Sequence, residues 1–504
     1  MRQILAVLGV ILLSSLSAAA QNRLITGIVT DAENKGIVAA SIEVQGKPIS
    51  AVTDAEGRFR MNVPEGKVTL NVSSIGFQSQ TVVLQEKETR VTVALVESTQ
   101  ELKDVVVTSF GVKKQKKSLG YAVGELKGED LTKNKEINLG NALQGKIAGV
   151  NVSAPVTGPS GSSRVVIRGA TSASGLNQPL YVVDGIPIDN TQQGNAGMWG
   201  GADKGDGMSS FNPDDIASMS VLKGSAASAL YGYRGSNGVI LITTKKGKNG
   251  SGIGVDFSTN SAFNTPASLL KWQDQYGAGA PDANGVPTRF TNLQELRDSY
   301  YFAWGDKYDG TPSLSLDGKT RPYQAYGKDN VENFYRTGYS FSNTLAISGG
   351  NESTNFRLSF GNTKDESILP ETTFGRNNVA LSLNSAPNKR ISIESNAQYI
   401  SEKSHNRPYL NDSPRNPSFP TTFMTPGTDI RWISNPYDAN GGEEDYLGAN
   451  VYHTNPYFAT KSPLNDDLRK RFIGSAKVNY NITDKIYAKA VIGIDDINYE
   501  YTEI

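Results

Sequence analysis

The sequence predicts a mainly β protein with an α/β domain in its middle. Short β-branched runs separated by Gly, Asn and Asp turns fill residues 24–98. Helix-type and strand-type patterns mix over 119–248, and after Lys248 apolar and polar residues alternate in several strand-length runs. We therefore expect an N-terminal β-sandwich, an α/β domain and the first part of an antiparallel transmembrane β-barrel.

The composition excludes several classes of function. The 504 residues carry 50 Lys and Arg against 50 Asp and Glu, so bulk charge does not favour a nucleic-acid partner. The chain has no cysteine and only two histidines, His405 and His453, which leaves no basis for a disulfide, a Cys-ligated metal or a His-rich metal site. We expect neither a metal nor a cofactor.

The N-terminus has the pattern of a secretory signal peptide. Arg2 precedes an apolar run over 4–13 and small residues over 17–20, which predicts a signal peptide over 1–20 with cleavage after Ala20. No later run reaches the roughly 18 apolar residues of a spanning helix. A membrane position for the mature chain would therefore require β-barrel strands.

Residues 22–98 are predicted to form a small β-sandwich, because turn signals at 31–34, 53–57 and 64–66 separate short β-type runs. The strands are expected at 25–30, 41–44, 58–63, 68–72, 81–84 and 90–95.

A β-branched run opens the next segment, 101–118. The residues after it are too polar to give it a core, so it suits addition as an edge strand to another protein. A terminal strand of the preceding domain is the alternative. The lysines over 113–117 indicate a solvated linker. The candidate binding residues are Asp104, Val105, Val106, Val107 and Thr108.

Residues 119–248 are predicted to form the α/β domain. Leu139, Leu143 and Ile147 share one face of an expected amphipathic helix over 138–148. The sequence Asn-Pro-Asp-Asp at 212–215 is typical of a helix-opening cap. Strands are expected at 150–152, 164–169, 180–185, 220–224 and 238–245, and a short helix at 226–230.

Catalytic patterns in this domain are weak. Asp184, Asp214 and Asp215 could be paired carboxylates, but they stand where turns and caps favour Asp. The glycines at 224–238 do not have the spacing of a phosphate-binding loop or its following Lys-Ser/Thr. We expect no enzymatic activity.

Residues 249–504 have the alternation of barrel strands. Phe356, Leu358 and Phe360 alternate with Arg357 and Ser359, which predicts a lipid face and a polar lumen face. The same period recurs near 341–347, 379–384, 391–399, 472–480 and 488–493.

The connections between these strands are short at 349–353, 386–389 and 483–485, but long at 263–339 and 402–470, as in outer-membrane barrels. About seven strands are predicted, whereas a barrel plugged by a globular domain needs about 22. We therefore expect an incomplete barrel and a chain that is the N-terminal part of a longer protein. Aromatic residues in the long connections could contact a sugar or peptide, or only pack the loops: Trp272, Tyr300, Tyr301, Trp304, Tyr308, Trp432 and Tyr437.

The chain resembles the SusC/RagA-type TonB-dependent transporters of the outer membrane. The run 101–108 resembles their TonB box, and residues 28–31, 52–59 and 74–77 resemble their carboxypeptidase-regulatory-like domain. Six further segments resemble the plug domain of these transporters: 140–150, 166–169, 181–187, 221–227, 231–232 and 237–240. The sequence departs from the plug pattern at Tyr233, Gly235 and Ser236.

This resemblance implies nutrient import across the outer membrane, with the N-terminal domain in the periplasm. The implied partners are TonB with ExbB and ExbD, bound through the box, and a SusD-like surface lipoprotein that presents an oligosaccharide or peptide. A non-transporting surface binding protein or adhesin is the alternative, and it would need no functional box. A signal transducer would need an additional βαβ-type module before the box.

Overall fold

The computed structural model describes residues 22–31, 33–74, 77–96, 105–107, 113–115, 123–170, 177–194, 196–247, 252–267, 271–351, 353–448, 453–462, 464–483 and 486–503. The chain divides into two compact units, Met1–Asp104 and Val105–Ile504. The predicted signal peptide lies outside the described residues. None of the described helices has the length and apolarity needed to cross a membrane.

The first unit is the predicted β-sandwich. Its two sheets have the strand orders β4-β1-β7 and β3-β2-β5-β6, with a core that includes Ile25, Ile42 and Leu70 between them. The short strand β3 was not predicted, because its three residues lack an alternating pattern. The strands are β1 Asn22–Thr30, β2 Ser41–Val44, β3 Ser50–Val52, β4 Arg58–Pro64, β5 Val68–Ser73, β6 Gln80–Leu84 and β7 Arg90–Ala94.

The second unit contains the predicted α/β domain, which we call the plug, and its five-stranded sheet has the order β10-β15-β16-β13-β14. Strands β13 and β16 are parallel, and the Asp184-Gly185 turn, with φ of 48° and 87°, joins β13 to β14. The elements are β10 Val123–Lys127, α2 Gly128–Lys133, η4 Asn141–Leu143, β11 Val150–Ser153, β12 Arg164–Ile167, β13 Leu180–Val183, β14 Ile186–Pro187, η5 Pro213–Asp215, β15 Ile216–Leu222, α3 Ser225–Tyr231, η6 Gly232–Gly235 and β16 Val239–Thr244.

The predicted helix over 138–148 is wrong. Only the single turn η4 forms there, because Gly145 has a φ of 70° and ends any regular helix. A Cβ on Gly140 would lie 1.9 Å from Ser163 Oγ, so the segment is also pressed against a neighbouring loop. The apolar residues of the expected face are still buried, Leu139 and Leu143 completely.

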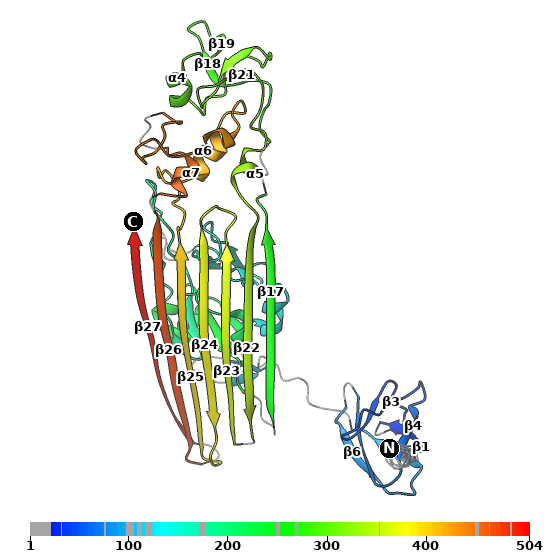
Figure 1. The fold of residues 1–504 in the computed structure, drawn as a ribbon. Coiled ribbons are helices and arrows are strands. Elements are labelled where there is room, and N and C mark those ends of the chain that lie inside the picture. The colour runs from blue at the N-terminus through cyan, green and yellow to red at the C-terminus, as the bar shows by residue number, and fades with distance from the viewer. Residues whose placement is uncertain are drawn as a thin grey trace, which may run out of the picture. The chain divides into compact units, whose positions relative to one another are not determined.

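The remainder of the second unit is built on a seven-stranded antiparallel sheet, which we call the wall. Its strands lie side by side in chain order (Figure 1), and β17 and β27 are its edges among the described residues. The strands are β17 Ile253–Asn264, β22 Gly338–Gly350, β23 Thr354–Glu366, β24 Thr373–Ser385, β25 Ile391–His405, β26 Asn465–Asn481 and β27 Tyr487–Glu503.

The two faces of the wall differ as the alternation predicts. Phe360 and Leu381 are exposed, whereas Arg357, Ser359 and Ser382 on the same strands are buried on the other face. The predicted fold class, a β-sandwich, an α/β plug and an open run of antiparallel barrel-type strands, is confirmed.

The two long connections fold together at one end of the wall strands (Figure 1). We call the described residues within 265–337 and 406–464 the outer unit. Asn330 clamps them, because its side chain donates to Thr428 O at 2.9 Å and accepts from Ile430 N at 2.9 Å. The shared core was not predicted, and it includes Phe290, Leu296, Tyr300, Leu316, Met424, Ile430 and Ile433.

The regular elements of the outer unit are short. They are β18 Gly279–Pro281, β19 Pro287–Arg289, α4 Leu293–Asp298, β20 Pro312–Leu314, β21 Thr320–Pro322, α5 Asn330–Phe334, α6 Ser418–Phe423, η7 Ile430–Ile433 and α7 Pro456–Ala459.

Candidate functional site at the plug and the wall

The candidate box is only partly described. Val105–Val107 form strand β8, which pairs antiparallel with β9, Lys113–Gln115, and Val106 lies opposite Lys114. Asp104 and Thr108 lie outside the described residues. Lys113–Gln115, which were predicted to belong to a solvated linker, thus form a short strand. This strand occupies one hydrogen-bonding edge of Val105–Val107 within the chain itself.

Asp215 joins the plug to the wall. Its Oδ1 accepts from Arg357 Nη1 at 2.8 Å and from Ser359 Oγ at 2.6 Å, and its Oδ2 accepts from Asn378 Nδ2 at 3.1 Å. All four side chains are buried. A buried carboxylate needs this number of partners to offset its loss of hydration. Nearby, Asn212 Nδ2 donates to Thr344 Oγ1 at 3.0 Å.

Arginines on the wall bind backbone carbonyls of the plug. Arg376 donates to Ser209 O at 2.5 Å. Arg469 donates to Asp206 O at 2.7 Å and to Lys204 O at 2.8 Å. These charge-assisted bonds hold a stretch of plug that has no strand or helix of its own.

Arg471 and Asp495 together bind both backbone groups of Asp189. Arg471 Nη2 donates to Asp189 O at 2.9 Å, and Asp189 N donates to Asp495 Oδ2 at 2.9 Å. The guanidinium and the carboxylate also form an ion pair at 2.7 Å. Arg471 Nη1 additionally donates to Gly207 O at 2.7 Å.

The wall also completes the apolar core of the plug. Ile400 and Ile473 belong to the same buried cluster as Leu143, Val221 and Ile240 of the plug. Displacing the plug from the wall would therefore expose apolar surface as well as break polar contacts.

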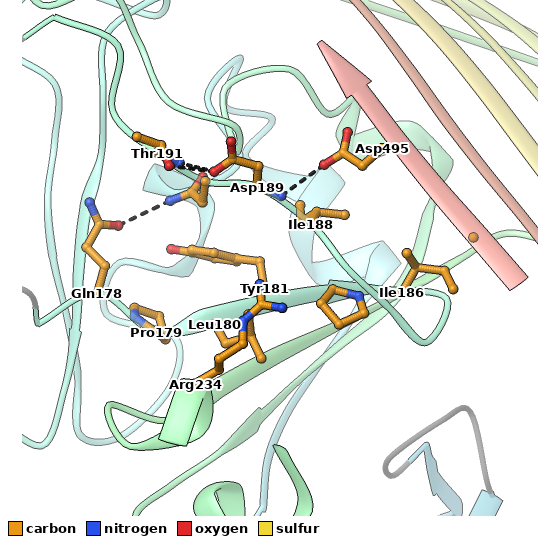
Figure 2. Close-up of a pocket in the computed structure, with 13 residues that line it drawn as sticks. Gln178, Pro179, Leu180, Tyr181, Ile186, Ile188, Asp189, Thr191, Arg234 and Asp495 are labelled. Atoms are coloured by element: carbon orange, nitrogen blue, oxygen red, sulfur yellow. Dashed lines mark hydrogen bonds between the residues drawn. The ribbon is translucent and has the colours of Figure 1, made fainter. Parts of the chain in front are cut away.

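A cavity of about 590 Å³ lies between the β13–β14 hairpin and β27. Figure 2 shows Asp189 and Asp495 facing each other at its upper rim and Arg234 at its lower side. Tyr181 is buried beside the cavity, and its hydroxyl has no hydrogen-bond partner among the described residues. The mixed polar and apolar lining suits water or a small polar molecule.

The three aspartates considered as paired carboxylates have separate structural roles. Asp184 accepts from Thr244 Oγ1 at 2.6 Å, whereas Asp214 forms an ion pair with Lys135 at 2.5 Å. Burial alone would raise the pKa of Asp214, but the hydrogen bond from Lys135 brings it below the ordinary value. The cap prediction for 212–215 is confirmed as a 3-10 turn, in which Asn212 accepts from Asp214 N.

Asp206 is a buried carboxylate of the plug whose pKa is raised. Burial raises its pKa to about 6, although backbone N–H groups of Ser209 and Ser163 donate to its carboxylate and oppose the rise. The carboxylate fixes the loop that Arg469 contacts from the wall.

No group of three or more His, Cys, Asp or Glu side chains suited to a metal occurs in the described part of the chain.

Several aromatic residues of the outer unit serve packing. Tyr300 is fully buried, and Trp432 is covered by the Arg321 guanidinium, 3.9 Å from the ring centroid. Trp304 is 70% exposed and Trp272 41% exposed.

The sequence did not indicate the interface arginines as such. The available signal was a basic residue at an inward position of an alternating strand, as for Arg357 between Phe356 and Leu358, and for Arg471 before Phe472. That pattern predicts a buried or lumen-facing charge, but it does not reveal the partner.

Comparison with known proteins agrees with this geometry. The TonB-dependent Receptor Plug Domain family matches residues 115–239, and the CarboxypepD_reg-like domain family matches residues 25–107. The TonB-dependent receptor SusC of Bacteroides thetaiotaomicron is 33% identical over 392 residues, which cover 77% of this chain and 35% of that protein. The TonB-dependent receptor P39 of Formosa agariphila is 31% identical over 52% of this chain and 24% of its own length.

The fold is similar to that of the RagAB peptide importer. The closed-closed state gives a TM-score of 0.54 at 22% identity over 77% of this chain and 42% of that chain. The open-open state gives 0.55 at 21% identity over 79% and 43%.

The chain carries the plug domain of TonB-dependent receptors, a family of the outer membrane. It is homologous to the receptor SusC and has the fold of the RagAB importer, so it resembles the SusC/RagA type. It spans about a third of the length of the SusC protein that it matches, 35%.

Proposed function

We propose that this chain serves in a TonB-dependent transporter of the outer membrane that imports a nutrient, either an oligosaccharide or a peptide. The observation that carries the proposal is the seating of the plug in the wall, with Asp215, Arg469 and Arg471 at the interface. A buried interface of this kind closes a passage until the plug moves.

The energy input is proposed to act at Asp104–Thr108. TonB, energised by ExbB and ExbD in the inner membrane, would add a strand to this run from the periplasmic side, where the N-terminal β-sandwich would also lie. Strand addition relies on backbone hydrogen bonds, each worth about 0.5–1.5 kcal/mol net, so a short run gives a reversible hold.

A pull on the box would reach the plug at β10. This strand follows the box segment, lies at the edge of the plug sheet and pairs with β15 from Val123 opposite Leu222 to Lys127 opposite Ser218. An edge strand can be peeled away without first breaking the inner strands. The plug can therefore loosen from β10 inward.

The outer unit is proposed to receive the nutrient together with a SusD-like surface lipoprotein. Its own core makes it a folded body rather than a set of separate loops. The exposed Trp304 and Trp272 remain free of the packing that occupies Tyr300 and Trp432.

Deleting residues 105–108 in the receptor tests this function. Uptake should be abolished while ligand binding at the cell surface is retained, because the deletion removes the proposed TonB-binding strand and leaves the outer unit intact. Val106→Pro should have the same effect by removing a backbone donor, and Val106→Ile should behave as wild type. Unchanged uptake after the deletion would favour a non-transporting surface binding protein.

A further inference from the structure

The apical loop of the plug, residues 196–206, lies against residues 407–413, which we call the strap. The strap begins two residues after the last residue of β25. Ala202 and Tyr409 form an antiparallel bridge, and Leu410 N donates to Gly201 O at 2.9 Å. The strap is therefore attached to the plug through backbone groups.

Two further contacts extend this attachment. Asn411 Nδ2 donates to Gly197 O at 2.9 Å. A Cβ on Gly200 would lie 2.5 Å from Ser413 Cβ, so the chain passes here too closely for any other residue. Gly200 also has a φ of 102°, which suits only glycine.

Arg407 connects the strap to both the plug and the wall. Its Nη1 donates to Ser160 O at 2.9 Å and to Asp203 O at 3.3 Å, both on the plug. On the wall it forms an ion pair with Asp467 and donates to Ser404 Oγ at 2.7 Å. Arg407 and Asp467 are only 4% and 3% exposed.

The backbone of Arg407 is fixed independently of the plug. Asn465 on β26 accepts from Arg407 N at 2.9 Å and donates to Arg407 O at 3.1 Å. The wall therefore holds Arg407 through contacts that do not involve the plug, with Asp467 binding the guanidinium and Asn465 binding the backbone.

The strap is the first part of the second long connection, and it is bonded to the rest of the outer unit. Asn416 Nδ2 donates to Asn411 O at 2.9 Å, and Tyr335 Oη and Ser418 Oγ lie 2.7 Å apart, joining the two long connections. The apical loop of the plug thus contacts a segment that belongs to the same body as the proposed ligand-receiving loops.

We propose that the strap is a latch that must release the apical loop during each transport cycle, and that Arg407 is the positioning residue that returns the loop to its place. The inference rests on the proposed function, since it requires that the plug be displaced. Most strap contacts are neutral hydrogen bonds that water can replace at little net cost. Arg407 is different, because the donors it directs at Ser160 and Asp203 stay oriented by Asp467 and favour the return of the plug.

A reversible disulfide across the bridge tests the latch. Ala202→Cys with Tyr409→Cys places two thiols at opposed positions in a chain that has no other cysteine. Oxidised receptor should lose at least tenfold in uptake, retain ligand binding, and recover uptake on reduction. Recovery shows that the variant is folded. Complete cross-linking with unchanged uptake would overturn the proposal.

The control pair is Asn362→Cys with Asn377→Cys, which joins β23 to β24 within the wall, where the two amides are 2.7 Å apart. Its oxidation should not change uptake, and an equal loss in the control would overturn the latch reading. The deletion of 105–108 is assayed in parallel. If that deletion stops uptake and the locked strap does not, the strap fails while the import function stands; if the deletion has no effect, the import function itself fails.

The role of Arg407 has a separate test. Arg407→Lys keeps the positive charge next to Asp467 but removes the forked donors. In this background, the thiol of Ala202→Cys, at a position only 6% exposed in the wild-type chain, should be labelled by a maleimide several-fold faster, and uptake should fall without a change in ligand binding. Equal labelling and uptake in the Arg and Lys backgrounds would contradict a positioning role.

Discussion

Asp215 and Arg357 show at the scale of single residues how the plug is held. One side chain comes from the plug and the other from the wall, and they meet at 2.8 Å with 7% or 8% of each side chain exposed. Ser359 and Asn378 complete the hydrogen bonding of the carboxylate. Removing one member of such a pair leaves a buried charge without a partner, which is strongly destabilising.

Asp215→Ala should lower the free energy of unfolding of the receptor by about 3–5 kcal/mol, because Arg357 would stay buried and unpaired. Denaturant unfolding followed by tryptophan fluorescence measures the change. Asp130→Asn is the control, since Asp130 pairs with Lys133 on the surface and should give no measurable change. Equal stability of the two variants would show that the plug is not held at Asp215.

We predict that His453 makes the outer unit sensitive to pH. Its ring stacks on Phe419 with centroids 4.5 Å apart, and burial lowers its pKa below 6.5 while Asp412 partly offsets the shift. The unfolded chain therefore binds the proton more readily than the folded one. The contribution of neutral His453 to the stability of the fold is complete above pH 6.5, the pKa in the unfolded chain. It is lost as the pH falls through the lower pKa of the folded state.

His453→Phe should remove this pH dependence while keeping a stacked ring. Limited proteolysis of the outer unit between pH 7.5 and pH 5 compares the two proteins. The wild type should become more susceptible at the lower pH, and the variant should change less. The same acid sensitivity in both would assign it to another group.

At the scale of elements, the segment 138–149 shows that a helical spacing of buried residues does not by itself make a helix. Leu139, Leu143 and Ile147 are buried as an amphipathic helix would require, yet the backbone turns at Gly145 and Gly149, whose φ values are 70° and 73°. Apolar spacing alone therefore gave the correct core and the wrong element.

Gly145→Ala distinguishes the two descriptions. In the turn, an added Cβ at positive φ should lower the free energy of unfolding by about 1 kcal/mol. In a helix, the same change would raise it by about 0.5–1 kcal/mol. Thermal unfolding of the receptor gives the sign, and stabilisation would refute the turn.

The wall strands could be predicted from the sequence because their signal is local. Each residue of β23 or β24 reveals its face through its immediate neighbours, as Arg357 does between Phe356 and Leu358. The outer unit could not, because its core brings Leu296 and Ile430 together from connections that lie far apart in the chain. Partners across the interface, such as Asp215 for Arg357, are non-local in the same way.

At the scale of the whole second unit, the plug and the wall depend on each other. The wall supplies Ile400 and Ile473 to the plug core, and the plug covers arginines on the facing side of the wall. The strap adds an attachment between the apex of the plug and the outer unit. The candidate box precedes β10 in the chain, so under the proposed function a pull on it would act on the plug first at this edge strand.

The most direct test of the account is cross-linking from position 106. Val106→Cys introduces the sole thiol of the chain, and single cysteines along the periplasmic part of TonB provide partners. A disulfide should form mainly with the TonB position directly opposite residue 106 and more weakly two residues to either side, as the alternation of side chains in a strand pair requires. It should increase when ligand is bound, whereas Lys87→Cys on the exposed surface of the β-sandwich should form none. A Val106→Cys receptor that imports normally without cross-linking to TonB would contradict the account.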